Sequence, residues 1–128
     1  MAEQQDYRSK ALALREFKQE LVGGKMDRAL SLQREASLSV TEVSSVVATS
    51  FAELVEKQDY LRALEVGRQY GVEQQKMQEV INLQYGAYFG KGEFELAAQW
   101  AAEHNLSANE VLKAGVKIFQ RELLNGQV

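Results

Sequence analysis

The sequence predicts an all-α fold, an array of antiparallel helical hairpins within one domain, on the basis of three observations. First, its 128 residues include no proline, although proteins average about 5%; long helices joined by glycine or polar turns fit this best. Second, the strong helix formers Ala, Leu, Glu, Gln, Lys and Arg are abundant. Third, a pattern of apolar and aromatic residues returns with a fixed 34-residue period. Such a period is typical of helical repeat proteins, whose repeats bury their apolar faces against one another.

Composition and charge narrow the class of protein. A chain of 128 residues fits one domain with a buried core. The lack of cysteine and the single histidine exclude disulfides, thiolate metal sites and multi-histidine zinc sites. A net charge of −3 gives no electrostatic drive towards nucleic acid or an anionic membrane. No apolar run approaches the roughly 20 residues of a membrane span, and the start MAEQQDYRSK lacks the apolar core of a secretory signal. We therefore expect a soluble, cytoplasmic protein.

The 34-residue repeat is clearest where three segments align. These segments are MDRALSL from Met26, YLRALEV from Tyr60 and FELAAQW from Phe94. The same shift relates an aromatic row, Phe17, Phe51, Tyr85 and Phe119, and an apolar row, Leu21, Val55, Phe89 and Leu123. Aromatic residues make up 9% of the chain, so four at one phase would arise by chance with a probability on the order of one in ten thousand. Both rows are predicted to form the core.

Each repeat is predicted as a long helix, a tight turn, a shorter helix and a second turn. Apolar spacing places long helices at about 5–22, 40–56, 74–89 and 107–124, and short ones at about 26–37, 59–70 and 93–104. Gly23–Gly24 and Gly90–Gly92 stand where long helices should end, since glycine adopts the left-handed backbone of a helix terminus. Two further long helices should open with capping boxes, Ser39 with Glu42 and Ser107 with Glu110.

The segment Val40–Val47 is the place where a strand competes with a helix. Its sequence, VTEVSSVV, is rich in β-branched residues. Strict alternation fails at Glu42–Val43, however, and the apolar residues fall at three- and four-residue steps. The spacing therefore favours a helix.

The short-helix segments carry a family resemblance. A 34-residue hairpin containing KQDYLRALEVGRQYGV and KGEFELAAQWAAEHNL resembles the tetratricopeptide repeat. In that family the second helix begins with a Gly-Asp-aromatic turn and carries an alanine on its packing face. Gly92-Glu93-Phe94 with Ala97 matches this pattern, and Gln58-Asp59-Tyr60 with Ala63 nearly does. The resemblance implies a right-handed array of about three and a half repeats and seven helices, with repeats at about 6–39, 40–73 and 74–106 and a closing helix at 107–125.

The sequence departs from the family pattern in two respects. The proline usual near the end of a repeat is replaced by Thr41, Gln75 and Asn109. The small residue expected on the first helix is aromatic, at Phe17, Phe51 and Tyr85. The second departure implies wider spacing between helices than in a standard array.

Motifs that suggest catalysis or ligand binding have simpler interpretations. GAYFGKG at 86–92 is similar to a phosphate loop, but only three residues separate its first two glycines and no hydroxyl residue follows the lysine. His104 near the end of a short helix is expected to be structural or to contact a partner. Three glutamates, Glu93, Glu95 and Glu103, fall on a turn and a polar helix face, where no cleft would split their pKa values. We expect no catalytic, metal or cofactor site, and no enzymatic activity.

A basic strip at the start of the chain is also expected to be structural. Lys10, Arg15 and Lys18 are interleaved with Glu16 and Glu20. This spacing suits ion pairs rather than a track for phosphates. RNA binding of the pentatricopeptide kind would need a net basic groove, so we expect no nucleic-acid partner.

Stacked hairpins form a concave surface lined by the long helices, and such surfaces bind peptides or helices. The resemblance places the groove-facing positions next to the core rows. The candidate partner-binding residues are Ala48, Ala52, Asn82, Gly86, Tyr88 and Gln120. Tyr88, whose other repeat equivalents are Glu20 and Glu122, lies either in the interior of the array or in the groove. The small residues among them leave room for a ligand backbone or an inserted helix. Ala52 and Gly86 cannot supply the Lys and Asn clamp with which some family members grip a terminal carboxylate.

The closing helix carries apolar residues beyond the repeating pattern. Leu112, Val116, Ile118 and Leu124 stand where the preceding repeat has Gln78, Asn82, Gln84 and Gly90. Apolar surface of this kind is usually covered, by the chain itself, by a second copy or by a partner. These four residues are therefore candidates for self-association or docking.

Two kinds of function follow from the sequence. We expect a protein–protein interaction module, a small adaptor or chaperone-like scaffold that binds a peptide or helix of a protein partner. The alternative is a regulatory or structural subunit that acts through self-association, for example as a homodimer, by means of its closing helix.

Overall fold

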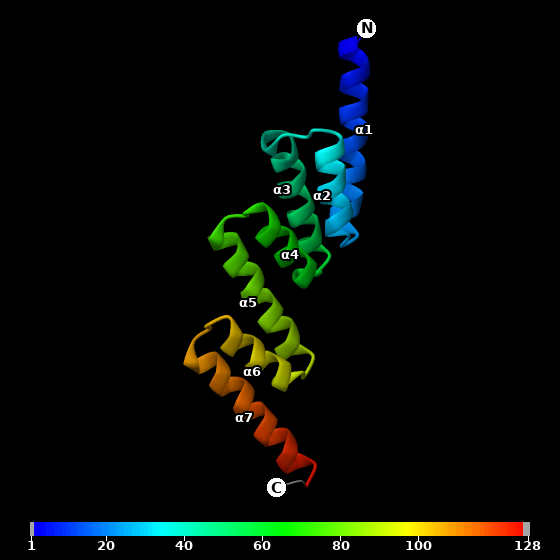
Figure 1. Ribbon diagram of the computed structural model, residues 1–128. Coiled ribbons are helices and arrows are strands. Elements are labelled where there is room, and N and C mark those ends of the chain that lie inside the picture. The colour runs from blue at the N-terminus through cyan, green and yellow to red at the C-terminus, as the bar shows by residue number, and fades with distance from the viewer. Residues whose placement is uncertain (1, 127–128) are drawn as a thin grey trace. The chain divides into compact units, whose positions relative to one another are not determined.

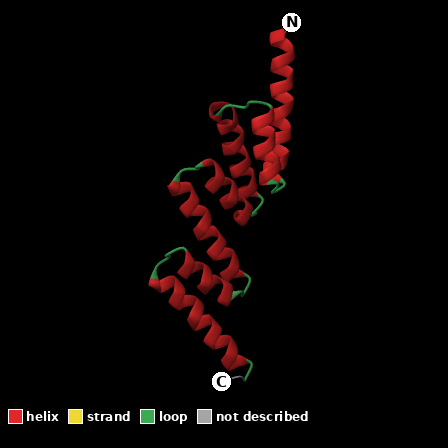
Figure 2. Cartoon of the chain, in the orientation of Figure 1, coloured by secondary structure: helices red, strands yellow, loops and turns green. Residues whose placement is uncertain are grey.

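The structure is a computed structural model, and it describes residues 2–126. Within these residues the chain forms seven helices and no strand. Figures 1 and 2 show how these helices follow one another along the chain. The helices are α1 (Ala2–Val22), α2 (Met26–Glu35), α3 (Val40–Glu56), α4 (Tyr60–Tyr70), α5 (Gln74–Gly90), α6 (Phe94–Glu103) and α7 (Ala108–Leu124). The all-α prediction is confirmed, and α3 includes the segment for which a strand was the alternative.

The chain divides into two compact units, residues 1–80 (unit 1) and residues 81–128 (unit 2). The division falls inside α5, which contributes its first turns to unit 1 and the rest to unit 2. In unit 1, α1 packs against α2 and α3, and α3 packs against α4. In unit 2, α6 packs against α7. Each unit is therefore built from helices that are close neighbours along the chain.

Left-handed backbone positions recur at the interval found in the sequence. Those in the described residues form two series, each with the same 34-residue spacing. The turns after long helices contain Gly24 (φ 78°), Gln58 (63°), Gly92 (78°) and Gly126 (71°). The turns after short helices contain Ser37 (54°), Gly71 (70°) and Asn105 (55°). The turn geometry repeats even where the residue is not glycine, so the 34-residue period belongs to the backbone as well as to the side chains.

Small residues on the short helices allow close helix packing. The alanine row predicted for these helices is fully buried, at Ala29, Ala63 and Ala97. On α4, Gly67 lies so close to α3 and α5 that a Cβ atom there would overlap the sulfur of Met77 and come within 3.3 Å of the Phe51 ring. Glycine at this position therefore permits the close approach of three helices in unit 1.

The aromatic row is buried at three of its four positions. Phe17 is fully buried and meets Tyr70 edge-on, with ring centroids 5.6 Å apart. Phe51 and Tyr85 are also buried, but Phe119 is exposed, as is Leu123 of the apolar row. For these two residues the prediction of a core position is wrong. The reason is that α7 packs against α6 on one side, and its other side is left uncovered by the described part of the chain.

Two ion pairs join α1 to α3. Lys10 Nζ lies 3.4 Å from Glu42 Oε2, and Lys18 Nζ lies 3.7 Å from Glu53 Oε2. The sequence predicted pairs with glutamates of the same helix, whereas these lysines reach the neighbouring one. Exposed pairs of this kind contribute only about 0.2–1 kcal/mol each, so the buried rows dominate the packing.

The two predicted capping boxes differ in the structure. At the start of α3, Ser39 Oγ accepts from the Glu42 amide at 3.0 Å, and the Ser39 amide donates to Glu42 Oε1 at 3.1 Å. These bonds to Ser39 lower the pKa of the Glu42 carboxyl. At the start of α7, Ser107 Oγ accepts from the Glu110 amide at 3.4 Å, and the Glu110 carboxylate faces Lys113 at 3.6 Å. The first box is therefore complete, and the second is formed by its serine half.

Candidate functional site

Helix α7 has an inner face that fixes it to α6. Ala114 is fully buried in a cluster with Tyr85, Ala97 and Ala101. Nearer the C-terminus of the helix, Arg121 donates from Nη1 to the Gly92 carbonyl oxygen at 3.3 Å and pairs with the Glu95 carboxylate.

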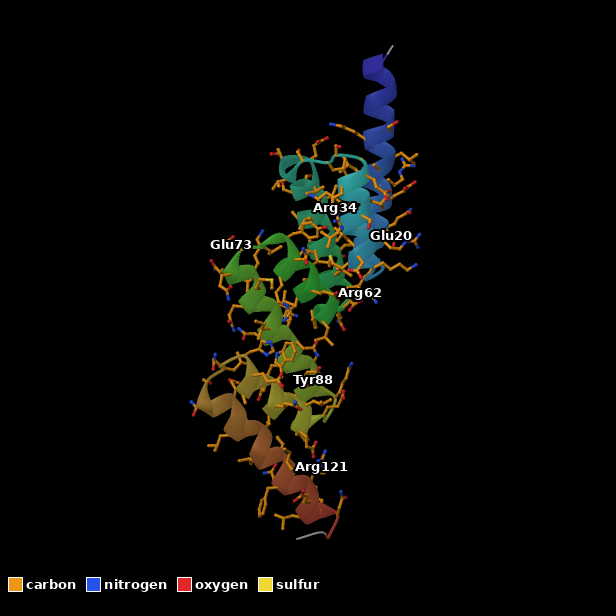
Figure 3. The ribbon with its side chains drawn as sticks, viewed as in Figure 1. Glu20, Arg34, Arg62, Glu73, Tyr88 and Arg121 are labelled. Atoms are coloured by element: carbon orange, nitrogen blue, oxygen red, sulfur yellow. The ribbon has the colours of Figure 1, made fainter. Side chains whose placement is uncertain are left out.

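The Arg121 guanidinium also interacts with two residues at the start of α6, Phe94 and Glu95. Its carbon lies 5.8 Å from the centre of the Phe94 ring, as in a cation–π contact. The pKa of Glu95 is lowered, first by a bond to its own backbone amide and then by Arg121. Figure 3 shows Arg121 among the side chains of α7. With its inner face held in this way, α7 presents a defined outer face.

The outer face of α7 is a continuous apolar row. Its members are Leu112, Val116, Phe119 and Leu123, which are 68%, 48%, 52% and 50% exposed. Their spacing of four, three and four residues keeps them on one side of the helix over about 17 Å. Lys113 and Lys117 are exposed as well. We refer to these four apolar residues as the α7 row.

The face of α1 that corresponds to the α7 row is partly covered within unit 1. Three repeats earlier, its members are Lys10, Leu14, Phe17 and Leu21. Phe17 and Leu21 are fully buried, and Lys10 reaches Glu42 of α3. Thus the two positions that are buried on α1, those of Phe17 and Leu21, are open on α7, at Phe119 and Leu123.

The predicted docking residues on α7 partly coincide with this row. Leu112 and Val116 belong to it, Leu124 is exposed beside its end, and Ile118 is partly buried. Phe119 and Leu123 were missed as surface residues because they fit the repeating core pattern. The signal that could have identified them is their position on the closing helix, where a core row has no following repeat to cover it.

The predicted groove residues are distributed over both units. Ala48 and Ala52 are exposed on α3 in unit 1, and Asn82 and Gly86 are exposed on α5 in unit 2. A Cβ atom added at Gly86 would have no neighbouring atom within 4 Å. Gln120 is exposed on α7.

Tyr88 is the groove candidate that takes part in packing. It is half-buried (Tyr88 is labelled in Figure 3), and its ring meets Trp100 edge-on with centroids 5.9 Å apart. The Trp100 indole in turn donates from Nε1 to the Ile81 carbonyl oxygen at 2.9 Å. Tyr88 thus belongs mainly to the interior of unit 2.

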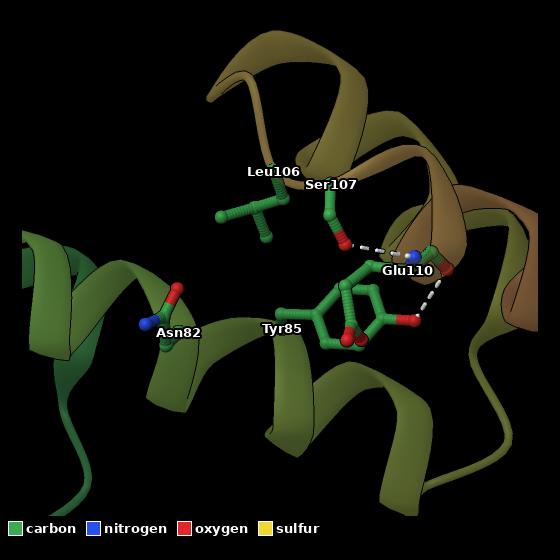
Figure 4. Close-up of a pocket in the computed structure, with 5 residues that line it drawn as sticks. All are labelled: Asn82, Tyr85, Leu106, Ser107 and Glu110. Atoms are coloured by element: carbon green, nitrogen blue, oxygen red, sulfur yellow. Dashed lines mark hydrogen bonds between the residues drawn. The ribbon is translucent and has the colours of Figure 1, made fainter.

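A pocket of about 400 Å³ lies in unit 2 between α5 and the start of α7. Figure 4 shows the residues that line it, Asn82, Tyr85, Leu106, Ser107 and Glu110. Tyr85 Oη donates to the Glu110 carbonyl oxygen at 2.7 Å. Burial raises the pKa of Tyr85, and the nearby Glu110 raises it further. This hydroxyl is therefore a structural link between α5 and α7.

The remaining candidate residues for chemistry have structural roles in unit 2. His104 ends α6, stacks on the Trp100 ring at a centroid distance of 3.9 Å and donates from Nδ1 to the Trp100 carbonyl oxygen at 3.0 Å. Glu103 accepts a bond of 3.0 Å from Gln99 Nε2. Among the side chains that the structure describes, no three His, Asp or Glu residues gather as a metal site would require. In the same part of the chain, no helix is both long and apolar enough to cross a membrane.

The fold and the site define an all-helical protein whose backbone has a 34-residue repeat, with an apolar row exposed on α7. Comparisons with protein-family models, curated proteins and solved structures gave no significant match.

Proposed function

We propose that this chain is a protein–protein interaction module made of tetratricopeptide-like repeats, and that it binds a helix of a partner protein through the α7 row. The module would act as an adaptor or scaffold in the cytoplasm. The proposal includes no enzymatic activity.

The observation that carries this proposal is the exposure of the α7 row. Four large apolar side chains in line are unusual on the surface of a monomer, and such patches are typical of interaction sites. A row spaced by three and four residues fits the ridges of another helix better than it fits an extended strand. Helix α1 supports a helical partner, because two of the equivalent positions there, Phe17 and Leu21, are buried among helices.

The groove positions are a second candidate for docking, considered separately within each unit: Ala48 and Ala52 in unit 1, and Asn82 and Gly86 in unit 2. Their exposure, and the open space around Gly86, are compatible with a ligand that lies against α3 or against α5. An arginine at Ala52 or Gly86 would obstruct such a ligand without entering the core. Retained partner binding by both variants would assign the interaction to α7 alone.

Site-specific photo-cross-linking in the producing cell tests the proposal. A benzophenone amino acid is placed at Phe119, and as a control at Leu61 on α4, which is 49% exposed and lies outside the row. We expect position 119 to give a discrete protein adduct that position 61 does not give. If position 119 yields no adduct while the variant is folded and abundant, the α7 row is not a docking surface.

A further inference from the structure

The first and the last described helices differ in their uncovered faces. On α1, the exposed side chains between residues 9 and 22 include Arg15, Glu16 and Gln19, with Leu12 as the exposed large apolar residue of that stretch. On α7, the uncovered face is the α7 row. A head-to-tail contact, α7 of one copy against α1 of the next, would place this apolar row against a largely polar face. A contact between two α7 helices places apolar residues against apolar residues.

We propose that the α7 row docks against the α7 row of a second copy, in an antiparallel pair related by a two-fold axis. This inference rests on the proposed function, in which the row is a docking surface, and it names the occupant. A closed two-fold contact uses the same patch on both copies and leaves none of it free to recruit further copies.

The antiparallel orientation follows from the sizes of the side chains. With the two-fold axis between Val116 and Phe119, Leu112 lies opposite Leu123 of the second copy, and Val116 lies opposite its Phe119. Each layer then has a similar volume, so the two helices can stay at an even distance. A parallel pair would place Val116 against Val116 and Phe119 against Phe119, and one layer would be thin where the next is thick. The observed four-three-four spacing is the spacing of a two-helix seam.

The charges beside the row are compatible with this register. In an antiparallel seam, Lys113 stands beside Gln120 of the second copy, and Glu122 stands beside its Gly115. Like charges therefore do not meet across the contact. The opposed directions of the two helix dipoles are also favourable.

The area available fits a reversible dimer. The four residues of the α7 row offer on the order of 400 Å² of apolar surface per copy. Two copies would bury on the order of 800 Å² through the row alone, which is smaller than a standard specific interface. We therefore expect a dimer that forms in concentrated solution and dissociates on dilution.

The mass of the 128-residue chain in solution tests for the second copy. Light scattering on a concentrated sample should approach twice the monomer mass of 14.4 kDa, and Val116→Asp should restore the monomer because it buries two carboxylates in the seam. The control is Leu61→Asp, which adds the same charge at a residue of matching exposure on α4 and should remain dimeric. A wild-type chain that stays monomeric when concentrated, or a dimer that Val116→Asp leaves intact, overturns the inference.

The register is tested with single cysteines, which is straightforward because the chain has none of its own. Leu112→Cys and Leu123→Cys are purified separately, one of them with a tag that changes its size. Under mild oxidation the mixture should give the mixed disulfide, and neither variant should cross-link efficiently alone. Cross-linking within each variant alone would show a parallel pair and refute the antiparallel register.

The two proposals fail in distinguishable ways. A monomeric chain whose position 119 cross-links to a different protein retains the docking surface and rejects the second copy. Position 119 cross-linking to the chain itself, together with the doubled mass, supports both.

Discussion

At the scale of single residues, the repeat is seen in the backbone φ angle even at positions where the side chain is not conserved between repeats. Gly24, Gln58 and Gly92 share a left-handed φ and occupy equivalent positions in the turns that follow α1, α3 and α5. The conformation costs an L-residue about 1–2 kcal/mol, and glycine is spared that cost. Gln58 therefore holds a strained position that the equivalent glycines occupy without strain.

Replacement of Gln58 by glycine should stabilise the protein. We expect a gain of about 0.5–1 kcal/mol, since the relief of left-handed strain exceeds the extra chain entropy of glycine. The measurement is the free energy of unfolding in urea. Gln58→Ala is the control and should bring no gain, because alanine retains the Cβ atom. Equal effects of the two substitutions would show that strain at Gln58 is negligible.

The aromatic row contains one phenol, and its hydroxyl has a specific task. Tyr85 stands where the other repeats have Phe17, Phe51 and Phe119, so the site accepts a phenyl ring without repacking. Its Oη bond to the Glu110 carbonyl oxygen links α5 to α7. Removal of the hydroxyl should therefore remove the link and little else.

We expect Tyr85→Phe to lower stability by about 1 kcal/mol at neutral pH. Its pH dependence is a second test. Because the pKa of Tyr85 is raised above the 10.0 of an exposed tyrosine, the neutral phenol is favoured in the folded state. This contribution is complete below pH 10 and is lost as the pH rises through the raised pKa. Between about pH 8 and about pH 11, wild type should lose more stability than Tyr85→Phe, as urea unfolding would show; parallel losses would contradict this role.

At the scale of helices, the starts of α3 and α7 show how one sequence motif gives two strengths of cap. Both begin with a serine followed three residues later by a glutamate. In α3 both halves of the box are formed, and in α7 the serine bond is longer, at 3.4 Å, while the glutamate faces Lys113.

The two caps should respond unequally to the same substitution. Ser39→Ala should cost about 1 kcal/mol, because a good serine cap of this kind is lost. Ser107→Ala should cost clearly less, since its longer bond satisfies the Glu110 amide less well. Urea unfolding of the two variants side by side gives the comparison. A larger loss at Ser107 would mean that the longer bond is the stronger cap.

Much of the fold was predictable from the sequence because the residues that begin and end its helices recur along the chain. Helix ends were placed within a few residues, since glycine stops and serine starts recur in step with the 34-residue repeat of the apolar rows. Periodicity shows which side of a helix is apolar, but it does not show what lies over that side. For this reason Phe119 was predicted as core, and Lys10 was expected to pair within its own helix.

At the scale of the whole molecule, the candidate site is an apolar helix face, the α7 row, that no other described part of the chain covers. The sequence marked the closing helix as unusually apolar and identified Leu112 and Val116. It did not identify Phe119 and Leu123, because in a repeat protein the same position is core in one repeat and surface in the last. The groove positions and the division into repeats stay predictions from the family resemblance.

The packing of helices against their near neighbours in each unit also governs how quickly the chain reaches its structure. Contacts between segments close in sequence need only short loops to close, and chains rich in them fold in microseconds to milliseconds. The slow exchange of prolyl bonds, which takes about 10–100 s, cannot occur in a chain without proline. Stopped-flow refolding should therefore finish within about a second, and it should not depend on how long the protein was first held in denaturant. A slow phase that grows with that delay would contradict this expectation. A newly made chain would thus expose its core residues only briefly and would need no prolyl isomerase to mature.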